Sequence, residues 1–413
     1  MDELNGASDD FNEARHDFNG VGHDSIEVTH DFSFKWHLTI YPLQKGGSVL
    51  QQTAAPVKKL TDWLEKEGYD GILLRKRQNF SWITGGKVNH IENTTEYGVA
   101  DLLIIPRINK KYCFTSKMES RRIMEEELND FDFELVECEW YESIIPLIRK
   151  HIEGKMIVGD STFLGLEDVS SELAYLRSQL SETEITNYKW LCQKAAGALE
   201  NVCHEIKRGM TEHEIAALLA QKVMEDGINP QVILVATDER IFNYRHPIPT
   251  AKKLENYAMI VICAEKFGLV ANCTRFVHFG ELPETLRENT QKLAKIDITM
   301  NMATKPGVRI NEVFEKGLQA YAEVGFPEDW RFLHQGGLTG FAPREFLASR
   351  ETDHIIVKNQ AFAWNPAIRG IKSEDTIFVD EEGNQFLTHT GNWVYIEVEY
   401  DGKIYKRPDV LVR

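Results

Sequence analysis

The stretch IVICAEKFGLVANCTRF, residues 260–276, decides how the second half of this chain folds. Two apolar runs flank Phe267-Gly268, and a two-residue loop with glycine between such runs is typical of a β-hairpin. Closing the hairpin at this loop pairs Cys263 with Asn272. Because cross-strand partners share a face of a sheet, these two side chains are predicted to point to the same side.

The segments on either side of this hairpin predict helices and then strands. SETE (181–184) and TEHE (211–214) are capping boxes, and each opens a segment whose apolar residues recur with helical spacing. Two further helices are expected at 283–303 and 310–324, and the end of the chain is rich in strand-forming residues. This order predicts an α+β fold with the helices covering one face of a mainly antiparallel sheet.

The chain is long enough for two domains and a leader. Strands and helices alternate over residues 56–160, which predicts a smaller α/β domain. Residues 1–33 hold nine Asp and Glu residues against one Arg, a composition typical of disorder. We therefore expect a leader at 1–50, an α/β domain at 51–178 and a larger domain at 179–413.

Composition excludes several classes of partner. The formal net charge is 47 − 64 = −17, which argues against nucleic acid and against anionic membrane surfaces. No apolar segment is long enough to span a membrane, and no signal peptide is recognisable at the start of the chain. The six cysteines show no CxxC spacing, so reduced thiols and a cytoplasmic location are expected.

Polar residues at strand ends and in tight loops are the candidates for a functional site. His246 lies in NYRHPIP and His334 lies in HQGG. Asn365 and Glu374 stand near the two ends of NPAIRGIKSEDT, which joins two predicted strands. Such positions are typical of active sites, because a rigid scaffold places loop residues there.

In their order, these motifs resemble the catalytic domain of the creatinase/aminopeptidase P family, the pita-bread fold. The resemblance covers residues 181–390: KRGMTEHEIA, then TRF…FG, an HxxG loop, an xxP strand and SEDT. Residues 56–160 are similar to the smaller N-terminal domain of the two-domain members. The resemblance implies a C-terminal pita-bread domain preceded by a smaller α/β creatinase-type domain, and commonly a homodimer.

The resemblance also implies a site for two divalent ions held by Asp, Asp, His, Glu and Glu. In this chain the five positions fall on Cys263, Asn272, Leu338, Asn365 and Glu374. The hairpin loop is two residues shorter than the family pattern, and an even deletion keeps both hairpin positions on one face. Only Glu374 is retained, and one carboxylate cannot offset two divalent ions. No cofactor is therefore expected, with a single Mn, Co or Zn ion on a rebuilt ligand set as the alternative.

The resemblance implies a mechanism like that of creatinase, which works without a metal ion. Its histidine at the position of His246 acts as acid and base. The chain is predicted to hydrolyse a C–N bond of an amide, peptide or guanidino compound in a small molecule or short peptide. The predicted catalytic residues are His246, His334 and Glu374. The predicted substrate-binding residues are Asn272, Cys263, Asn365, Arg344 and Glu345.

Other interpretations of these residues stay open. Either histidine could be structural, and Cys263 could be a core residue or a nucleophile. Glu374 could be a buried carboxylate paired with Lys372 or Arg369. Arg344-Glu345 could be a salt-bridged loop or a substrate clamp. The chain could be an Xaa-Pro-type metallo-aminopeptidase with an altered ligand set, or a binding protein without turnover. NFSWITGG (79–86) is expected to expose aromatic side chains at the homodimer contact.

Overall fold

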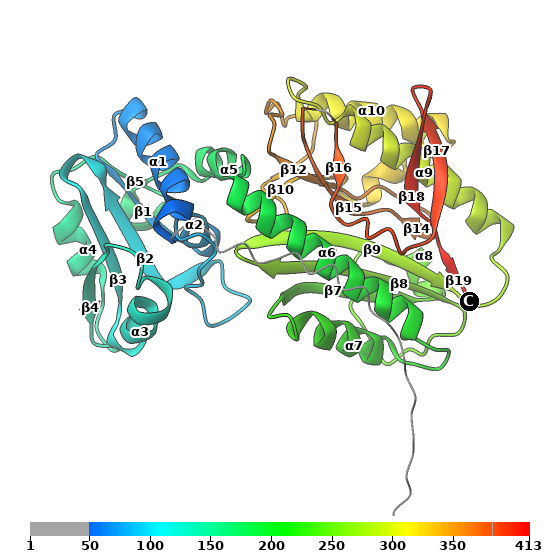
Figure 1. Ribbon diagram of the computed structural model, residues 1–413, viewed down its shortest axis with the longest axis horizontal. Helices are drawn as coiled ribbons and strands as arrows, with labels where there is room; N and C mark the ends of the chain where they lie inside the picture. Colours follow the sequence, from blue (N-terminus) through cyan, green and yellow to red (C-terminus); the bar gives the residue numbers. More distant parts are fainter. Residues whose placement is uncertain (1–48, 382) are drawn as a thin grey trace, which may run out of the picture. The chain divides into compact units, whose positions relative to one another are not determined.

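A long antiparallel hairpin, β8 (Tyr257–Lys266) and β9 (Leu269–His278), lies in the larger part of the protein (Figure 1). The computed structural model describes residues 49–381 and 383–413, so the expected leader lies outside the described residues apart from its last two positions. The turn is the predicted one, because Phe267 and Gly268 both have positive φ, 58° and 72°. The register is also confirmed: Cys263 pairs with Asn272.

The larger part contains a four-stranded and a five-stranded sheet, two two-stranded sheets, and the helices that pack on them. Its elements run, in chain order, α6 (Glu182–Glu205), α7 (Glu212–Met224), β7 (Asn229–Thr237), α8 (Glu239–Asn243), β8, β9, α9 (Glu284–Ala303), α10 (Ile310–Glu323), β10 (Gly336–Thr339), β11 (Phe346–Leu347), β12 (Ala361–Trp364), β13 (Ala367–Ile368), β14 (Ile371–Lys372), β15 (Asp375–Phe378), β16 (Gln385–Phe386), β17 (Tyr395–Tyr400), β18 (Lys403–Pro408) and β19 (Leu411–Val412). Both predicted capping boxes are present, at Ser181 and Thr211.

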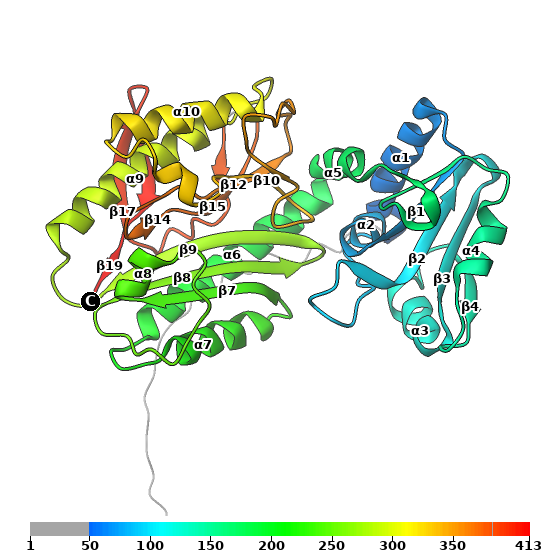
Figure 2. The same ribbon diagram turned by 180° about the vertical axis from the view of Figure 1, so that it is seen from behind.

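The hairpin belongs to a sheet in the order β19-β9-β8-β7, on which α6 and α7 pack (Figures 1 and 2). A second, antiparallel sheet has the order β11-β10-β12-β15-β16, and α9 packs against α10 and against its β12 strand. The sequence predicted one sheet, but the short strands after residue 336 pair with one another and form a separate sheet. The α+β class itself is confirmed.

The two sheets meet where β9 passes the start of β15. The backbone N–H of Thr274 donates to the carbonyl oxygen of Glu374, 3.1 Å away, and the hydroxyl of Thr376 accepts from the N–H of Asn272 at 2.9 Å. This junction carries most of the residues that the motifs singled out. The junction of the two sheets is therefore the candidate functional site.

The smaller part is an α/β unit around a six-stranded sheet, in the order β4-β3-β2-β1-β5-β6. Its elements are α1 (Val49–Glu67), β1 (Gly71–Lys76), α2 (Arg77–Ile83), β2 (Tyr97–Ile105), β3 (Lys110–Ser116), α3 (Lys117–Arg122), β4 (Glu134–Cys138), α4 (Ile145–Ile152), β5 (Ile157–Gly159), β6 (Glu167–Asp168) and α5 (Ser170–Ser178). Within the described residues, no helix is both long enough and apolar enough to cross a membrane.

One expectation about this smaller part is wrong. Phe80 and Trp82, expected to be exposed at a homodimer contact, are each 1% exposed and belong to the core. The reason is that the segment forms the short helix α2, which turns both rings inward against the sheet. Nothing in NFSWITGG therefore offers these aromatic rings to a partner.

Candidate functional site

Glu374 lies immediately before β15 and is the best-anchored residue at the junction of the two sheets. Its side chain is buried, and both carboxylate oxygens are engaged. Oε1 accepts from Nη2 of Arg344 at 2.9 Å, while Oε2 accepts from Nζ of Lys372 and from the hydroxyl of Thr274, both at 2.8 Å. Glu374 is thus held between two cations, and the three residues are called here the Arg344–Glu374–Lys372 cluster.

The charge state of this cluster follows from its contacts. Burial by itself opposes ionisation of Glu374, but Lys372 and then Arg344 outweigh it and hold the pKa of the carboxyl at about 2. The carboxylate is therefore ionised at neutral pH and faces one guanidinium and one ammonium group. The cluster therefore carries one net positive charge in a largely buried place.

Cys263 and Asn272 lie side by side on the hairpin, as the register requires. Burial raises the pKa of the Cys263 thiol to about 12, so this sulfur is neither a thiolate nucleophile nor a ready metal ligand at neutral pH. Asn272 is fully buried, and its Nδ2 donates to the hydroxyl of Thr339 at 3.2 Å. Its Oδ1 has no hydrogen-bond partner among the described residues.

Leu338 lies in β10 of the second sheet, and Asn365 directly follows β12. Leu338 in β10 is completely buried and belongs to an apolar cluster. The backbone N–H of Asn365 donates to the carbonyl of Gln335 at 3.0 Å, and its Oδ1 is buried without a described partner. Neither position offers a charged ligand.

These residues do not fit a centre of two divalent ions. The donor set consists of two neutral amides, a protonated thiol, an apolar side chain and one carboxylate whose oxygens already bind two cations. Within residues 49–381 and 383–413, no group of three or more His, Cys, Asp and Glu side chains is arranged to hold a metal ion. A divalent ion would also have to approach a cluster of net positive charge.

His246 and His334 are brought together beside this cluster. His246 follows α8, His334 precedes β10, and their ring centroids lie 5.8 Å apart on an exposed surface. Partial desolvation, followed by the charge of Lys372, lowers the pKa of His246, while Glu374 opposes this shift. Desolvation and the charge of Arg344 lower the pKa of His334 to about 4. Both imidazoles are therefore neutral at pH 7.

The hydrogen bonding of His334 indicates its tautomer. The N–H of Gly336 donates to Nδ1 of His334 at 3.3 Å, so Nδ1 accepts and the ring proton is assigned to Nε2. This bond fixes the ring against the turn that leads into β10. His334 thus serves the turn and faces His246 at the same time.

Glu345 was expected to bind substrate, but its side chain is buried in an ion pair. Its side chain is completely buried, and both carboxylate oxygens are taken by the guanidinium of Arg177, with Nε donating to Oε1 at 3.0 Å. Oε1 also accepts from the N–H of Phe341 at 3.0 Å. Of Arg344-Glu345, the glutamate therefore holds the loop in place, and the arginine faces the site.

Thr274 is a site residue that the motifs did not single out, and Lys372 was expected only as a possible ion-pair partner of Glu374, which it is. Lys372 stands two residues before Glu374, and Thr274 stands two residues after Asn272. Asn272 and Thr274 are two apart on β9 and therefore share a face, so this spacing was the available signal for Thr274. The contacts of Arg344 with Glu374 could not be read in the same way, because they join distant loops.

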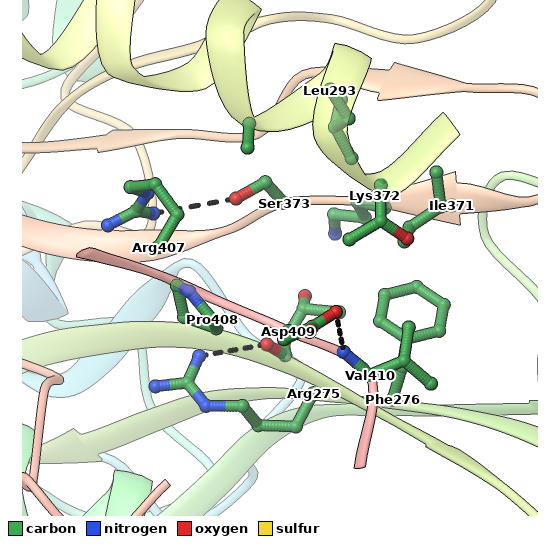
Figure 3. Close-up of a pocket in the computed structure, with 13 residues that line it drawn as sticks. Arg275, Phe276, Leu293, Ile371, Lys372, Ser373, Arg407, Pro408, Asp409 and Val410 are labelled. Atoms are coloured by element: carbon green, nitrogen blue, oxygen red, sulfur yellow. Dashed lines mark hydrogen bonds between the residues drawn. The ribbon is translucent and has the colours of Figure 1, made fainter. Parts of the chain in front are cut away.

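A charge network lies behind Glu374 and supports it. Asp375 is completely buried and pairs with Arg275 at 3.0 Å and with Arg407 at 2.7 Å. Figure 3 shows the small adjoining pocket, at which Arg407 also donates to the hydroxyl of Ser373 at 3.4 Å. The guanidinium groups lining this cavity are already paired. The network therefore fixes the start of β15 and offers no free charge to a ligand.

Sequence comparisons agree with this geometry over most of the chain. Residues 187–381 match metallopeptidase family M24, and residues 56–194 match the creatinase/prolidase N-terminal domain. An uncharacterized peptidase of Staphylococcus aureus is 21% identical over 355 residues, which is 81% of this chain and 98% of the relative.

Solved structures share the fold at low identity. A prolidase of Pyrococcus horikoshii OT3 is 19% identical with a TM-score of 0.68, covering 81% of this chain and 98% of its own. An X-Pro aminopeptidase of Thermotoga maritima MSB8 is 21% identical with a TM-score of 0.68, covering 86% and 99%. The N-terminal domain of the FACT complex subunit SPT16 from chickpea is 12% identical with a TM-score of 0.64, covering 83% and 97%.

At these identities the structural likeness concerns the fold alone. The two family matches together span residues 56–381 and agree with the pita-bread arrangement around the hairpin. The larger part of the chain therefore resembles metallopeptidase family M24, and the smaller part resembles the creatinase/prolidase N-terminal domain.

Proposed function

We propose that this protein is a hydrolase that cleaves a C–N bond in a small molecule or short peptide without a metal centre. The observation that carries the proposal is the pair of neutral, exposed histidines beside the buried Arg344–Glu374–Lys372 cluster. The family resemblance supports hydrolysis of peptide-type bonds as the reaction class.

His246 supplies the base in this mechanism. Because its pKa lies below the usual 6.5, the imidazole is unprotonated at pH 7 and can take a proton from an attacking water. The water oxygen bonds to the substrate carbonyl or guanidino carbon. The proton held by His246 then passes to the leaving nitrogen as the C–N bond breaks. His334, whose Nδ1 is bound to the turn, faces His246 and orients the water or the substrate.

The cluster supplies positive charge where negative charge develops. During attack, the substrate oxygen or nitrogen gains electron density, and guanidinium or ammonium donors fixed nearby stabilise it. Glu374 holds Arg344 and Lys372 in position, so no reorganisation is needed as the charge develops. The buried Oδ1 atoms of Asn272 and Asn365 remain available to accept hydrogen bonds from substrate N–H groups.

One observation favours a second candidate, a binding protein without turnover. The carboxylate of Glu374 is fully engaged in ion pairs, so it is not available as an acid or base. This candidate predicts ligand binding with no product from any substrate. The metallo-aminopeptidase alternative finds no support in the donor set described above.

The test is turnover of a panel of N-acyl amino acids, short peptides and guanidino acids, with and without chelator. Activity is expected to be unchanged by chelator, and His246→Ala is expected to reduce kcat by about 10²–10⁴-fold. The pH profile should fall on the acid side with a midpoint below 6.5, because protonation removes the base.

His204→Ala is the matched control, since this exposed histidine lies on α6 and packs on Trp393. Full turnover by His246→Ala would rule out the mechanism. Activity that chelator abolishes and Mn or Zn restores would rule out its metal independence.

A further inference from the structure

The turn that follows β4 presents two aromatic side chains to solvent. The backbone N–H of Glu142 donates to the carbonyl oxygen of Glu139 at 2.9 Å, which closes a four-residue turn with Trp140 and Tyr141 at its tip. These two residues are 72% and 69% exposed, and their ring centroids lie 5.5 Å apart with the ring planes at 88°. Small and polar residues usually occupy such positions, so turn formation does not explain the aromatic pair.

The apolar surface extends from this turn onto the neighbouring elements. Met118 on α3 is exposed, and the residue before it, Lys117, pairs with Glu139 at the start of the turn. Leu135 on β4 is also exposed. Because β4 is the last strand of the six-stranded sheet, its outer edge has no strand partner within the described part of the chain (Figure 1). Exposed apolar side chains beside an open sheet edge are typical of a place where another polypeptide segment docks. The name β4 turn surface is used here for Met118, Leu135, Trp140 and Tyr141.

The charges beside the aromatic pair are mainly negative. Desolvation and, after it, the charges of Glu142, Glu139 and Glu137 raise the pKa of the Cys138 thiol, so the three carboxylates gather around the start of the turn. Of these three, only Glu139 forms an ion pair within the described residues. The lysines of the adjacent strand β3 are already paired with other carboxylates. Glu137 and Glu142 therefore leave negative charge without a cation next to the exposed rings.

This combination matches a guanidinium group. The face of an aromatic ring attracts a cation, and an arginine side chain can stack on the ring while its N–H groups bind a carboxylate. We propose that the β4 turn surface docks an arginine-rich segment of a partner protein. The guanidinium groups of that segment stack on Trp140 and Tyr141 and pair with Glu137 and Glu142. Trp140 carries the largest share of the binding, because exposed aromatic residues of this kind dominate the energetics of interfaces.

Two other occupants fit the charges of this surface less well. In a symmetric dimer formed through it, each copy would present the same surface to the other, so the unpaired carboxylates of the two copies would face one another. Anionic lipid headgroups would likewise meet carboxylates of the same sign. A positively charged partner segment removes both repulsions.

The experiment is fluorescence anisotropy of labelled peptides titrated with the full chain at low and at high salt. A peptide in which Arg alternates with Ser is compared with the same peptide carrying Gln, or Glu, in place of Arg. The Arg peptide is expected to bind at least tenfold more tightly than the Gln peptide, and the Glu peptide is expected not to bind. Added salt should weaken binding of the Arg peptide, because it screens the exposed carboxylates.

Variants of the chain locate the binding. Trp140→Ala should weaken binding of the Arg peptide at least tenfold, and its thermal midpoint should stay unchanged because the side chain is exposed. Glu137→Gln combined with Glu142→Gln should weaken binding and reduce its dependence on salt. Ile404→Ala and Glu323→Gln are the matched controls, since both side chains are exposed and lie on other elements, β18 and α10.

Equal affinity for the Arg and Gln peptides would overturn the proposal, as would equal effects of Trp140→Ala and Ile404→Ala. Sedimentation of the unaltered chain as a dimer and of Trp140→Ala as a monomer would assign the surface to a second copy and reject the basic partner. Binding to phosphatidylserine vesicles that Trp140→Ala abolishes would reject it in favour of a membrane. None of these outcomes depends on turnover, so the proposed hydrolase is tested independently.

Discussion

Glu374 shows how a buried carboxylate can be held by two ion pairs. A carboxylate at this position contacts two side-chain cations, Arg344 and Lys372, in a site with little water. Breaking a buried ion pair by removing one partner is costly, because the remaining charge has no solvent to compensate it. Glu374 is therefore tied to stability as well as to the proposed chemistry.

Glu374→Gln should lower the free energy of unfolding by about 3–5 kcal/mol at pH 7, because two buried cations lose their counter-charge. Lys372→Met combined with Glu374→Gln should recover part of this loss. The pKa of Glu374 is about 2 in the folded chain against an ordinary 4.5, so its contribution is complete above pH 4.5. It disappears as the pH falls towards 2.

Denaturant unfolding between pH 3 and 7 measures this difference. The gap between wild type and Glu374→Gln should be widest near pH 7 and should narrow below pH 4.5. A gap that is independent of pH would contradict the charged state assigned to Glu374.

Residue positions that depend on local register could be predicted from the sequence. The shared face of Cys263 and Asn272 follows from the hairpin loop alone, and the structure confirms it. The contact of Arg344 with Glu374 could not be predicted, because Arg344 reaches it from a loop 30 residues away. The spacing of residues along the sequence does not indicate a contact between distant loops.

At the scale of elements, the tip of the β8–β9 hairpin is more constrained than a two-residue turn requires. Gly268 has a φ of 72°, and a Cβ added there would lie 2.5 Å from Cβ of Ser81 and 3.0 Å from the ring of Phe341. The tip is therefore clamped between α2 and the loop after β10. Its glycine serves both backbone conformation and close packing.

Gly268→Ala is expected to lower the free energy of unfolding more than Gly307→Ala does. Both glycines have positive φ, so both substitutions incur a backbone cost of about 1–2 kcal/mol. Only Gly268 has neighbours within 4 Å of the added methyl group, which adds about 1–3 kcal/mol. Thermal or denaturant unfolding measures both; equal losses would show that the tip is not clamped.

Elements with strong local signals were predictable, and the arrangement of the second sheet was not. Capping boxes opened α6 and α7 at Ser181 and Thr211 as expected, because the caps are local hydrogen bonds. The strands β10, β12 and β15 are only four residues long, and short apolar runs do not say which strand they pair with. Helix α2 was missed for the same reason, since seven residues carry little periodicity.

At the scale of the molecule, a line of buried polar contacts connects the smaller α/β part with the site. Asp160 accepts from Nδ2 of Asn79 at 2.9 Å, and Oδ1 of Asn79 accepts from Arg177 at 2.8 Å. Arg177, on α5, binds both oxygens of Glu345, whose neighbour Arg344 contacts Glu374. The loop that presents Arg344 is thus held by residues from three separate segments.

Arg177→Met should destabilise the chain by about 3–5 kcal/mol, because Glu345 would be left buried and unpaired. Arg177→Met with Glu345→Leu should restore much of this loss. Arg350→Met is the control, since Arg350 and Glu315 form an exposed pair worth about 0–1 kcal/mol. Equal midpoints for the Arg177 and Arg350 variants in denaturant would refute a structural role for the buried pair.

The Arg344–Glu374–Lys372 cluster also determines when the site becomes complete. A metal centre matures after folding and depends on which ions the surroundings supply and in what amounts. Arg344 and Lys372 are part of the polypeptide, so their positive charges reach the site when the chain folds. Starvation for divalent ions or loading with the wrong one would leave such a site untouched, and its readiness would depend on folding alone.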